Sequence, residues 1–292
     1  MGMDVTPPTR PPGSRRRGAI AVGRHVMWEA ASDRISLTAA GCAFYATLAL
    51  FPGIFLLVLV YGMAFDSATV EPQLEVLREL VPEETYDLIA GRLHELVSSP
   101  RPAMNWGAIV SGAVAIWSAS AGTRAMLGAL NMAHKVAETR GFLHYHLLAI
   151  GITLAATVAA TLAIASLVAL PGVAALLGLP APQAWALRGV SMGTLLLFVF
   201  VGLIVVYRLG PSGAHPGILW TLPGAIVATL IWAAASTGFT LYVSNFATYD
   251  LMYGPLGAVV VLLMWFWVSV YVVLLGAELN VALMAQHAST QG

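Results

Sequence analysis

Long stretches without charged side chains divide the chain into segments. They cover residues 35–65, 102–123, 141–187, 189–207, 209–249 and 251–277. A helix that crosses the hydrocarbon core of a bilayer needs about 20 apolar residues. The third stretch is too long for one helix and is interrupted by Pro171 and Pro180, and the fifth begins with the loop-like "LGPSGAHPG". The pattern therefore predicts six membrane-spanning helices, near 36–64, 103–123, 145–169, 188–207, 218–241 and 254–280.

The composition supports an all-α polytopic membrane protein. The chain is 59% hydrophobic and 10% charged, whereas soluble domains are roughly a quarter charged. A membrane β-barrel would show short alternating segments instead of continuous apolar runs. We expect a disordered basic tail over 1–18, one six-helix domain over 19–286 and a short cytoplasmic tail over 287–292.

Basic residues predict the orientation of the helices. Ten Lys and Arg residues fall on the side of the N-terminus and four on the other side. Because short cytoplasmic loops are enriched in Lys and Arg, both termini are expected in the cytoplasm.

Two further segments have amphipathic patterns. The N-terminal "RRRGAIAVGRHVMWEAASDR" fits a helix at the cytoplasmic interface. The outer loop between the first and second spans predicts two short helices, broken at Pro82. A solvated cap that rests on the helix ends is a simpler interpretation of this loop than a substrate-binding domain.

Glu278 is the only charged residue between Val260 and Met284. A carboxylate in a spanning helix must face protein or water, because exposure to lipid is costly. Glu278 lies 24 residues after Gly254, which is about 36 Å of helix, so it is expected near the cytoplasmic boundary. Two interpretations stay open, a structural ion pair and a transport or gating role shared with Asn280. The candidate cytoplasmic partners for an ion pair are Arg34, Arg124, Arg140 and Asn131.

Other candidate pathway residues lie on the first span and before the sixth. Pro52 removes a backbone hydrogen bond and predicts a kink. Thr38, Tyr45 and Thr47 place hydroxyls along the cytoplasmic half of the same helix. Asp250 and Tyr253 precede the sixth span. Asp250 there is typical of a helix cap or a solvated loop, unless the loop enters the bundle.

Catalytic and metal-binding patterns are absent from the sequence. His144 and His146 are two residues apart, so on a helix they point to different faces and suit shared ligation poorly. The chain contains no HExxH or phosphate-loop motif. We expect no catalytic residue, no metal site and no cofactor.

Three blocks together resemble the YihY/BrkB family of bacterial inner-membrane proteins. They are "RISLTAAGCAFYATLALFPG" at 34–53, "SASAGTRAMLGALNMAHKVAETRGFLHYHLLAI" at 118–150, and a third that runs from "YRLGP" through "YGPLGAVVVLLMWFW" to "LLGAELN" over 207–280. The resemblance implies six helices and a location in the bacterial inner (plasma) membrane. The residues of this chain that match motif positions of the family are Tyr45, Pro52, Asn131, Arg140, Tyr253, Gly254, Gly257, Gly276, Glu278 and Asn280.

The resemblance implies a membrane role without assigning chemistry. Some family members carry a ribonuclease label and others a virulence-factor or serum-resistance label, and certain relatives are linked to movement of lipid precursors of the outer membrane. The leading hypothesis is a non-enzymatic transporter of a lipid or amphipathic substrate, because few buried charges leave an apolar pathway. The alternative is a structural or assembly protein that acts through oligomer packing and partners. A membrane-associated ribonuclease is a third hypothesis, which the residues do not support.

The expected partners are membrane lipids and a possible second copy of the chain, and not nucleic acid. A groove open sideways to lipid and containing Glu278 would favour transport. A closed bundle with Glu278 bridged to Arg34, Arg124 or Arg140 would favour the structural alternative.

Overall fold

The computed structural model describes residues 35–64, 106–176, 181–213, 216–244 and 255–291. Six long helices make up almost all of this part of the chain, and no strand occurs in it. They are α2 (Ile35–Ala64), α5 (Trp106–Ala133), α6 (Phe142–Leu176), α7 (Ala181–Leu209), α8 (Ile218–Ser244) and α10 (Pro255–Gln291). The expected all-α class is confirmed for the described residues. Four helices are clearly longer than expected: α5 continues to Ala133, α6 continues past Pro171, α7 begins at Ala181, and α10 includes most of the expected C-terminal tail.

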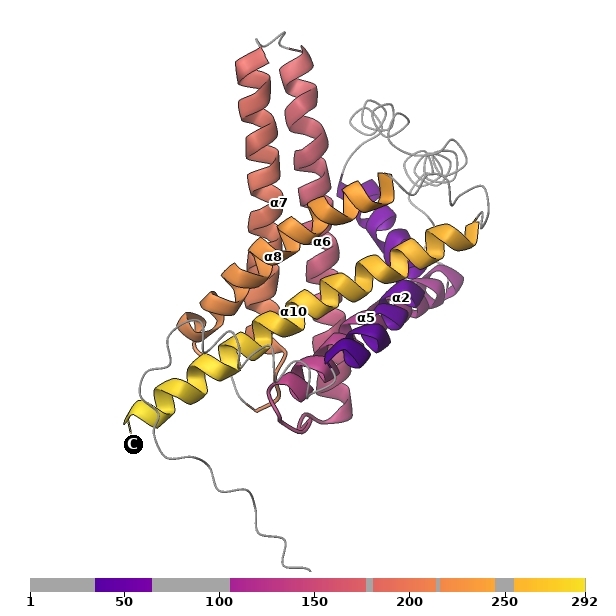
Figure 1. The fold of residues 1–292 in the computed structure, drawn as a ribbon. Coiled ribbons are helices and arrows are strands. Elements are labelled where there is room, and N and C mark those ends of the chain that lie inside the picture. The colour runs from indigo at the N-terminus through magenta and orange to yellow at the C-terminus, as the bar shows by residue number, and fades with distance from the viewer. Residues whose placement is uncertain (1–34, 65–105, 177–180, 214–215, 245–254, 292) are drawn as a thin grey trace, which may run out of the picture.

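The helices form two groups, one of α6, α7 and α8 and one of α2 and α5, which meet at one end of the molecule (Figure 1). α6 and α7 are an antiparallel pair, and α8 packs against α7. α10 contacts α8, α2 and α5, so it joins the two groups. α2 contains Pro52, and its ribbon changes direction along its length, which agrees with the expected kink.

Five of the described helices are long and apolar enough to span a membrane. The segments are Ile35–Leu57, Phe142–Ile164, Gly189–Leu209, Ile218–Tyr242 and Val259–His287. α5 does not meet the same hydropathy criterion, because it is rich in Gly, Ala and Ser and carries Arg124. A sixth crossing by α5 therefore stays a prediction.

Small side chains dominate the core at the end of the molecule where the α5–α6 and α7–α8 loops lie, here called the loop end. The core residues come from five helices: Ile35, Ala39, Cys42, Ala129, Leu130, Ala133, Leu203, Tyr207, Ala225, Ala228, Val270, Val272, Leu274 and Ala277. Alanine and glycine let helices approach closely where lipid supplies no hydrophobic driving force between them. Large apolar residues such as Phe51, Leu197 and Leu230 are instead exposed, as expected for surfaces that contact lipid.

Several sequence-based predictions lie outside the described residues. They are the basic tail, the interfacial N-terminal helix, the two helices of the outer loop, and the positions of Arg34, Asp250 and Tyr253.

Candidate functional site

The crossing of α8 and α10 at the loop end is too close for any side chain larger than hydrogen. A Cβ atom at Gly224 would collide with the carbonyl oxygen of Gly276 and the amide of Asn280. A Cβ atom at Gly276 would collide with the Tyr207 hydroxyl. Both positions therefore need glycine, for reasons of space.

Asn280 fastens α10 to the first turns of α8. Its Oδ1 accepts a hydrogen bond from the backbone N–H of Gly224 at 2.8 Å, and its Nδ2 donates to the carbonyl of Thr221 at 3.3 Å. The side chain is 1% exposed. Since a buried amide without partners is costly, these two bonds let Asn280 sit in the core and fix the register of the two helices.

Tyr207 attaches α7 to the same crossing. Its hydroxyl donates to the carbonyl of Val273 on α10 at 2.7 Å, and the residue is fully buried. Tyr207 and Gly224 were not among the predicted site residues. The signals that could have pointed to them are the motif "YRLGP" and the Pro-Gly pair at the start of "PGAIVATLIW".

Glu278 is 0% exposed and lies on a different face of α10 from Asn280. Two residues correspond to about 200° of rotation on a helix. By the same periodicity Glu278 shares a face with Trp267, whose Nε1 donates to the Ser36 carbonyl of α2 at 3.1 Å. That face of α10 is therefore turned toward the start of α2. Burial within protein is the environment that an acid in an apolar helix requires.

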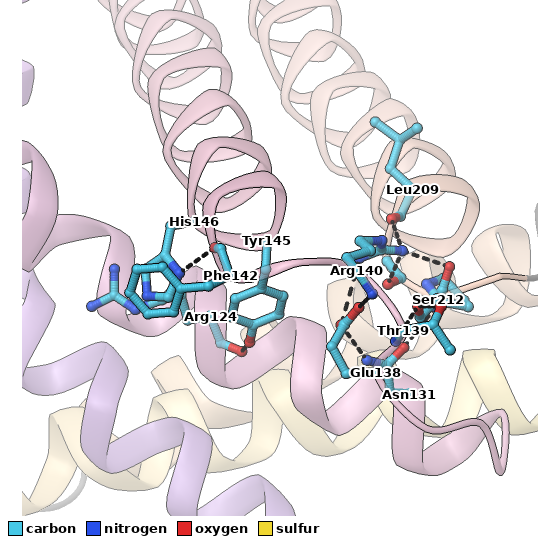
Figure 2. Close-up of polar contacts among 12 residues, drawn as sticks. Arg124, Asn131, Glu138, Thr139, Arg140, Phe142, Tyr145, His146, Leu209 and Ser212 are labelled. Carbon is cyan, nitrogen blue, oxygen red and sulfur yellow. Dashed lines mark hydrogen bonds and ion pairs between the residues drawn. The ribbon is translucent and has the colours of Figure 1, made fainter.

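Asn131 and Arg140 join the α5–α6 loop to the end of α7 (Figure 2). Asn131 accepts from the Ser212 N–H through Oδ1 and donates to Glu138 Oε2 through Nδ2, both at 2.7 Å. Arg140 Nη2 donates to the carbonyls of Leu209, Gly210 and Pro211, at 3.0, 2.9 and 2.7 Å. The last carbonyls of a helix lack intrahelical donors and carry partial negative charge, so a guanidinium is well placed there.

Glu138 completes this cluster. Its Oε1 accepts from the Arg140 N–H at 2.9 Å, and its Oε2 lies 3.8 Å from Arg140 Nη1. Partial burial opposes ionisation of the carboxyl group. The hydrogen bonds from Arg140, Asn131 and Ser212 and the charge of Arg140 outweigh that effect, so the pKa of Glu138 lies below its ordinary value.

Arg124 makes its contacts mainly within its own helix. Its Nη1 donates to the Trp117 carbonyl at 3.2 Å and to Ser120 Oγ, and its guanidinium lies 4.9 Å from the centre of the Trp117 ring. The contacts of Arg124, Arg140 and Asn131 described above thus involve residues other than Glu278. Their expected role as partners of that carboxylate stays a prediction.

The predicted hydroxyl residues of α2 are not gathered around one opening. Thr47 Oγ1 donates to the Ala43 carbonyl at 2.8 Å, and Thr38 Oγ1 lies 3.7 Å from Met132 Sδ. Tyr45 is 49% exposed. Hydroxyls that bond the carbonyl one turn earlier are satisfied by their own helix.

Pro52 lines a groove of about 470 Å³ between α2 and α5. The lining residues are Phe51, Pro52, Phe55, Val110, Val114, Ala115 and Ser118. Apart from the Ser118 hydroxyl, these side chains are apolar, and Glu278 is not among them. Among the residues with described positions, no group of three or more His, Cys, Asp or Glu side chains could hold a metal ion.

Comparison with known proteins identifies relatives of the chain. The family model described as Virulence factor BrkB matches residues 26–292. The ribonuclease-like protein YfkH of Bacillus subtilis is 30% identical over 252 residues, which are 82% of this chain and 87% of YfkH. The UPF0761 membrane protein PSHAa0171 of Pseudoalteromonas translucida is 34% identical over 87 residues, which are 30% of this chain and 29% of that protein.

No solved structure matches the chain. The family match covers nearly the whole sequence, and the helices described above are those of a multi-pass membrane protein. The chain therefore belongs to the BrkB (YihY) family of membrane proteins.

Proposed function

We propose that this protein moves a lipid or another amphipathic molecule across the bacterial inner membrane, and that the groove at Pro52 receives the apolar part of that molecule. The observation that supports the proposal best is the groove itself. Its volume of about 470 Å³ lies within the range of small-molecule sites, roughly 300–1,000 Å³, and its lining is almost wholly apolar.

The rim of the groove is accessible from the surface that contacts lipid. Phe51 is 76% exposed and Val114 is 59% exposed, so their side chains stand at the edge of the groove. Pro52 cannot donate to the carbonyl of Leu48, one turn earlier, and therefore leaves that carbonyl without its usual helical donor. An apolar groove beside a weakened turn would admit an acyl chain sideways and let the helix flex as the chain moves.

Orientation and partners complete the proposal. Both termini and the loop end lie on the cytoplasmic side, as the Lys and Arg distribution favours. Membrane lipids are the partners, a second copy of the chain is a further candidate, and no catalytic step is involved. Glu278 acts as a candidate gating residue on α10 rather than as part of the groove.

A structural or assembly role is the second candidate function. It is favoured by the hydrogen bonds of Asn131, Tyr207 and Asn280, which serve to lock loops and helices together. A protein whose polar residues only stabilise the bundle would act through its surface and its partners.

The two functions are separated by filling the groove. Ala115→Trp places an indole among the lining residues, and Ala155→Trp places the same side chain at an exposed position on α6 outside the groove. The purified proteins are reconstituted in liposomes, and transbilayer movement of fluorescent phospholipid and glycolipid is measured by quenching of the outer leaflet.

The proposal expects wild type and Ala155→Trp to move at least one lipid class at similar rates, and Ala115→Trp to move it about tenfold more slowly. Glu278→Gln, measured beside them, should also slow movement if the carboxyl group gates the path. Folded wild-type protein that moves neither lipid class would overturn the transport proposal and favour an assembly role.

A further inference from the structure

We propose that Arg124, framed by Trp117, Tyr145 and His146, binds the phosphate group of an anionic phospholipid from the surrounding leaflet. This inference concerns a lipid that stays bound at the surface of the protein. It holds whether or not the Pro52 groove carries a transported substrate.

The charge of Arg124 is not neutralised by the described part of the protein. No carboxylate of the described residues lies within ion-pair distance of it, and the acid of the α5–α6 loop, Glu138, pairs with Arg140 instead. Its two protein hydrogen bonds, to the Trp117 carbonyl and to Ser120, both leave from Nη1. A guanidinium has five N–H donors in a planar fork, so Nη2 and Nε keep donors for a further acceptor.

The Trp117 ring contacts the guanidinium, and aromatic side chains at the start of α6 pack on Trp117 and bond the Arg124 backbone. Arg124 lies over the ring of Trp117 with 4.9 Å between the guanidinium carbon and the ring centre. On α6, His146 stacks on Trp117 with ring centres 4.8 Å apart and planes 9° apart, and Tyr145 donates to the Arg124 carbonyl at 2.7 Å. Figure 2 shows Phe142, Tyr145 and His146 gathered beside Arg124 at the start of α6. The site is therefore built by two helices and is positioned before any ligand binds.

The depth of the cluster matches the head-group layer. Phe142 begins a candidate membrane span, and His146 lies four residues inside it, or about 6 Å of helix. Phe142, Leu143 and Leu147 are 74%, 69% and 57% exposed, so the first turns of α6 present apolar side chains to lipid. A guanidinium beside this turn lies where the phosphates of one leaflet lie.

Physical chemistry favours a phosphate as the missing partner. An arginine in a membrane-embedded helix is costly without a counter-charge. The planar fork of arginine matches two phosphate oxygens, and such charge-assisted bonds are stronger than neutral ones. The bilayer supplies phosphates at this level at very high local concentration, so a lipid is the expected occupant rather than a soluble ion.

Native mass spectrometry of the purified full-length protein tests the assignment. Phosphatidylglycerol and phosphatidylcholine are titrated separately against wild type, Arg124→Gln and Arg208→Gln. Arg208 is the matched control, because it is an exposed arginine in the last turn of α7, away from the aromatic cluster. Arg124→Lys keeps the charge without the planar fork, and circular dichroism with thermal unfolding checks that each variant is folded.

The expected result is a high-affinity phosphatidylglycerol that wild type and Arg208→Gln retain equally and that Arg124→Gln binds about tenfold more weakly. Arg124→Lys should fall between them, and phosphatidylcholine, whose choline cation balances its phosphate charge, should bind wild type more weakly and lose less affinity in Arg124→Gln. Equal phosphatidylglycerol binding by Arg124→Gln and Arg208→Gln would overturn the proposal. Displacement of the lipid by millimolar inorganic phosphate would also overturn it, since the site would then be one for a soluble anion.

Discussion

Two buried asparagines form hydrogen bonds to backbone groups of neighbouring elements. Asn280 bonds the Gly224 N–H and the Thr221 carbonyl, and Asn131 bonds the Ser212 N–H through the same kind of oxygen. A carboxamide can donate and accept at once, so it satisfies unpaired groups at helix ends without a buried charge. These residues stabilise connections between helices.

Glu138 carries a pH-dependent part of this stability. Because folding lowers the pKa of Glu138 below its ordinary value, its stabilising effect is complete above the ordinary pKa and is lost as the pH falls through the folded pKa. Glu138→Gln should lower the stability of the protein at pH 7 by about 1 kcal/mol, since the group is partly exposed and its ion pair is screened. Thermal unfolding in detergent at pH 7 and pH 3 measures the effect.

The difference in unfolding midpoint between wild type and Glu138→Gln should shrink from pH 7 to pH 3, because the stabilising effect of the ionised carboxyl group is progressively lost below its ordinary pKa. A gap of the same size at both pH values would show that the variant acts through shape and not through charge.

At the scale of elements, the closest contact between helices and the helical turn that lacks a hydrogen bond lie on different helices. α8 and α10 touch through Gly224 and Gly276, whereas α2 is interrupted by Pro52 beside a groove. Tight glycine contacts leave little freedom for sliding, and a proline inside a helix leaves one turn without its hydrogen bond. We therefore expect the α8–α10 pair to be the rigid part and the half of α2 that follows Pro52 to be the part that moves.

Gly224→Ala tests the rigid contact. The added Cβ meets backbone and side-chain atoms of α10, so the helices must separate, and we expect a loss of about 1–3 kcal/mol of stability. Gly238→Ala on the same helix is the control. Its Cβ has no neighbour within 4 Å, so it should be neutral or stabilise the helix by about 0.5–1 kcal/mol.

Thermal unfolding in one detergent compares the two alanine variants with wild type. Equal midpoints for Gly224→Ala and Gly238→Ala would contradict the close crossing of α8 and α10.

On the scale of the whole molecule, polar contacts concentrate at the loop end. The α5–α6 and α7–α8 loops meet there through Thr139 and Ser212, whose hydroxyl oxygens are 2.8 Å apart. The two loops are separated along the chain by two candidate spans, α6 and α7, so they lie on one side of the membrane whether or not α5 crosses it. The opposite ends of α6 and α7 project away from this cluster (Figure 1).

Cysteine labelling tests this arrangement. In a Cys42→Ala background, single cysteines replace Ala137, Gly217 and Ala285, which are exposed at or near the loop end. A membrane-impermeant maleimide should label all three in inside-out vesicles and none in right-side-out vesicles, because the loop end is proposed to be cytoplasmic. Labelling of Ala137 and Gly217 from opposite sides would contradict the contact between the two loops.

The run lengths of apolar residues were sufficient to predict the helices. Continuous hydrocarbon-like segments can satisfy their backbone groups in a membrane only as helices, so class and approximate boundaries follow from local pattern. The kink at Pro52 is also local, because the missing N–H belongs to one residue. The lower hydropathy of α5 relative to the other long helices has a physical reason as well. A helix with many small residues that packs against α2, α6 and α10 needs less apolar surface.

The partners of the polar residues could not be read from local pattern. Asn131 and Ser212 are 81 residues apart, and Asn280 and Gly224 are 56 residues apart. Such pairs depend on which faces of the helices turn toward one another, and a rotation of one residue, about 100°, changes every partner. The sequence by itself therefore identified Glu278, Asn280, Asn131 and Arg140 as unusual. Only the packing of the helices separated the Pro52 groove from Glu278, and only that packing gave the two asparagines and Arg140 their contacts.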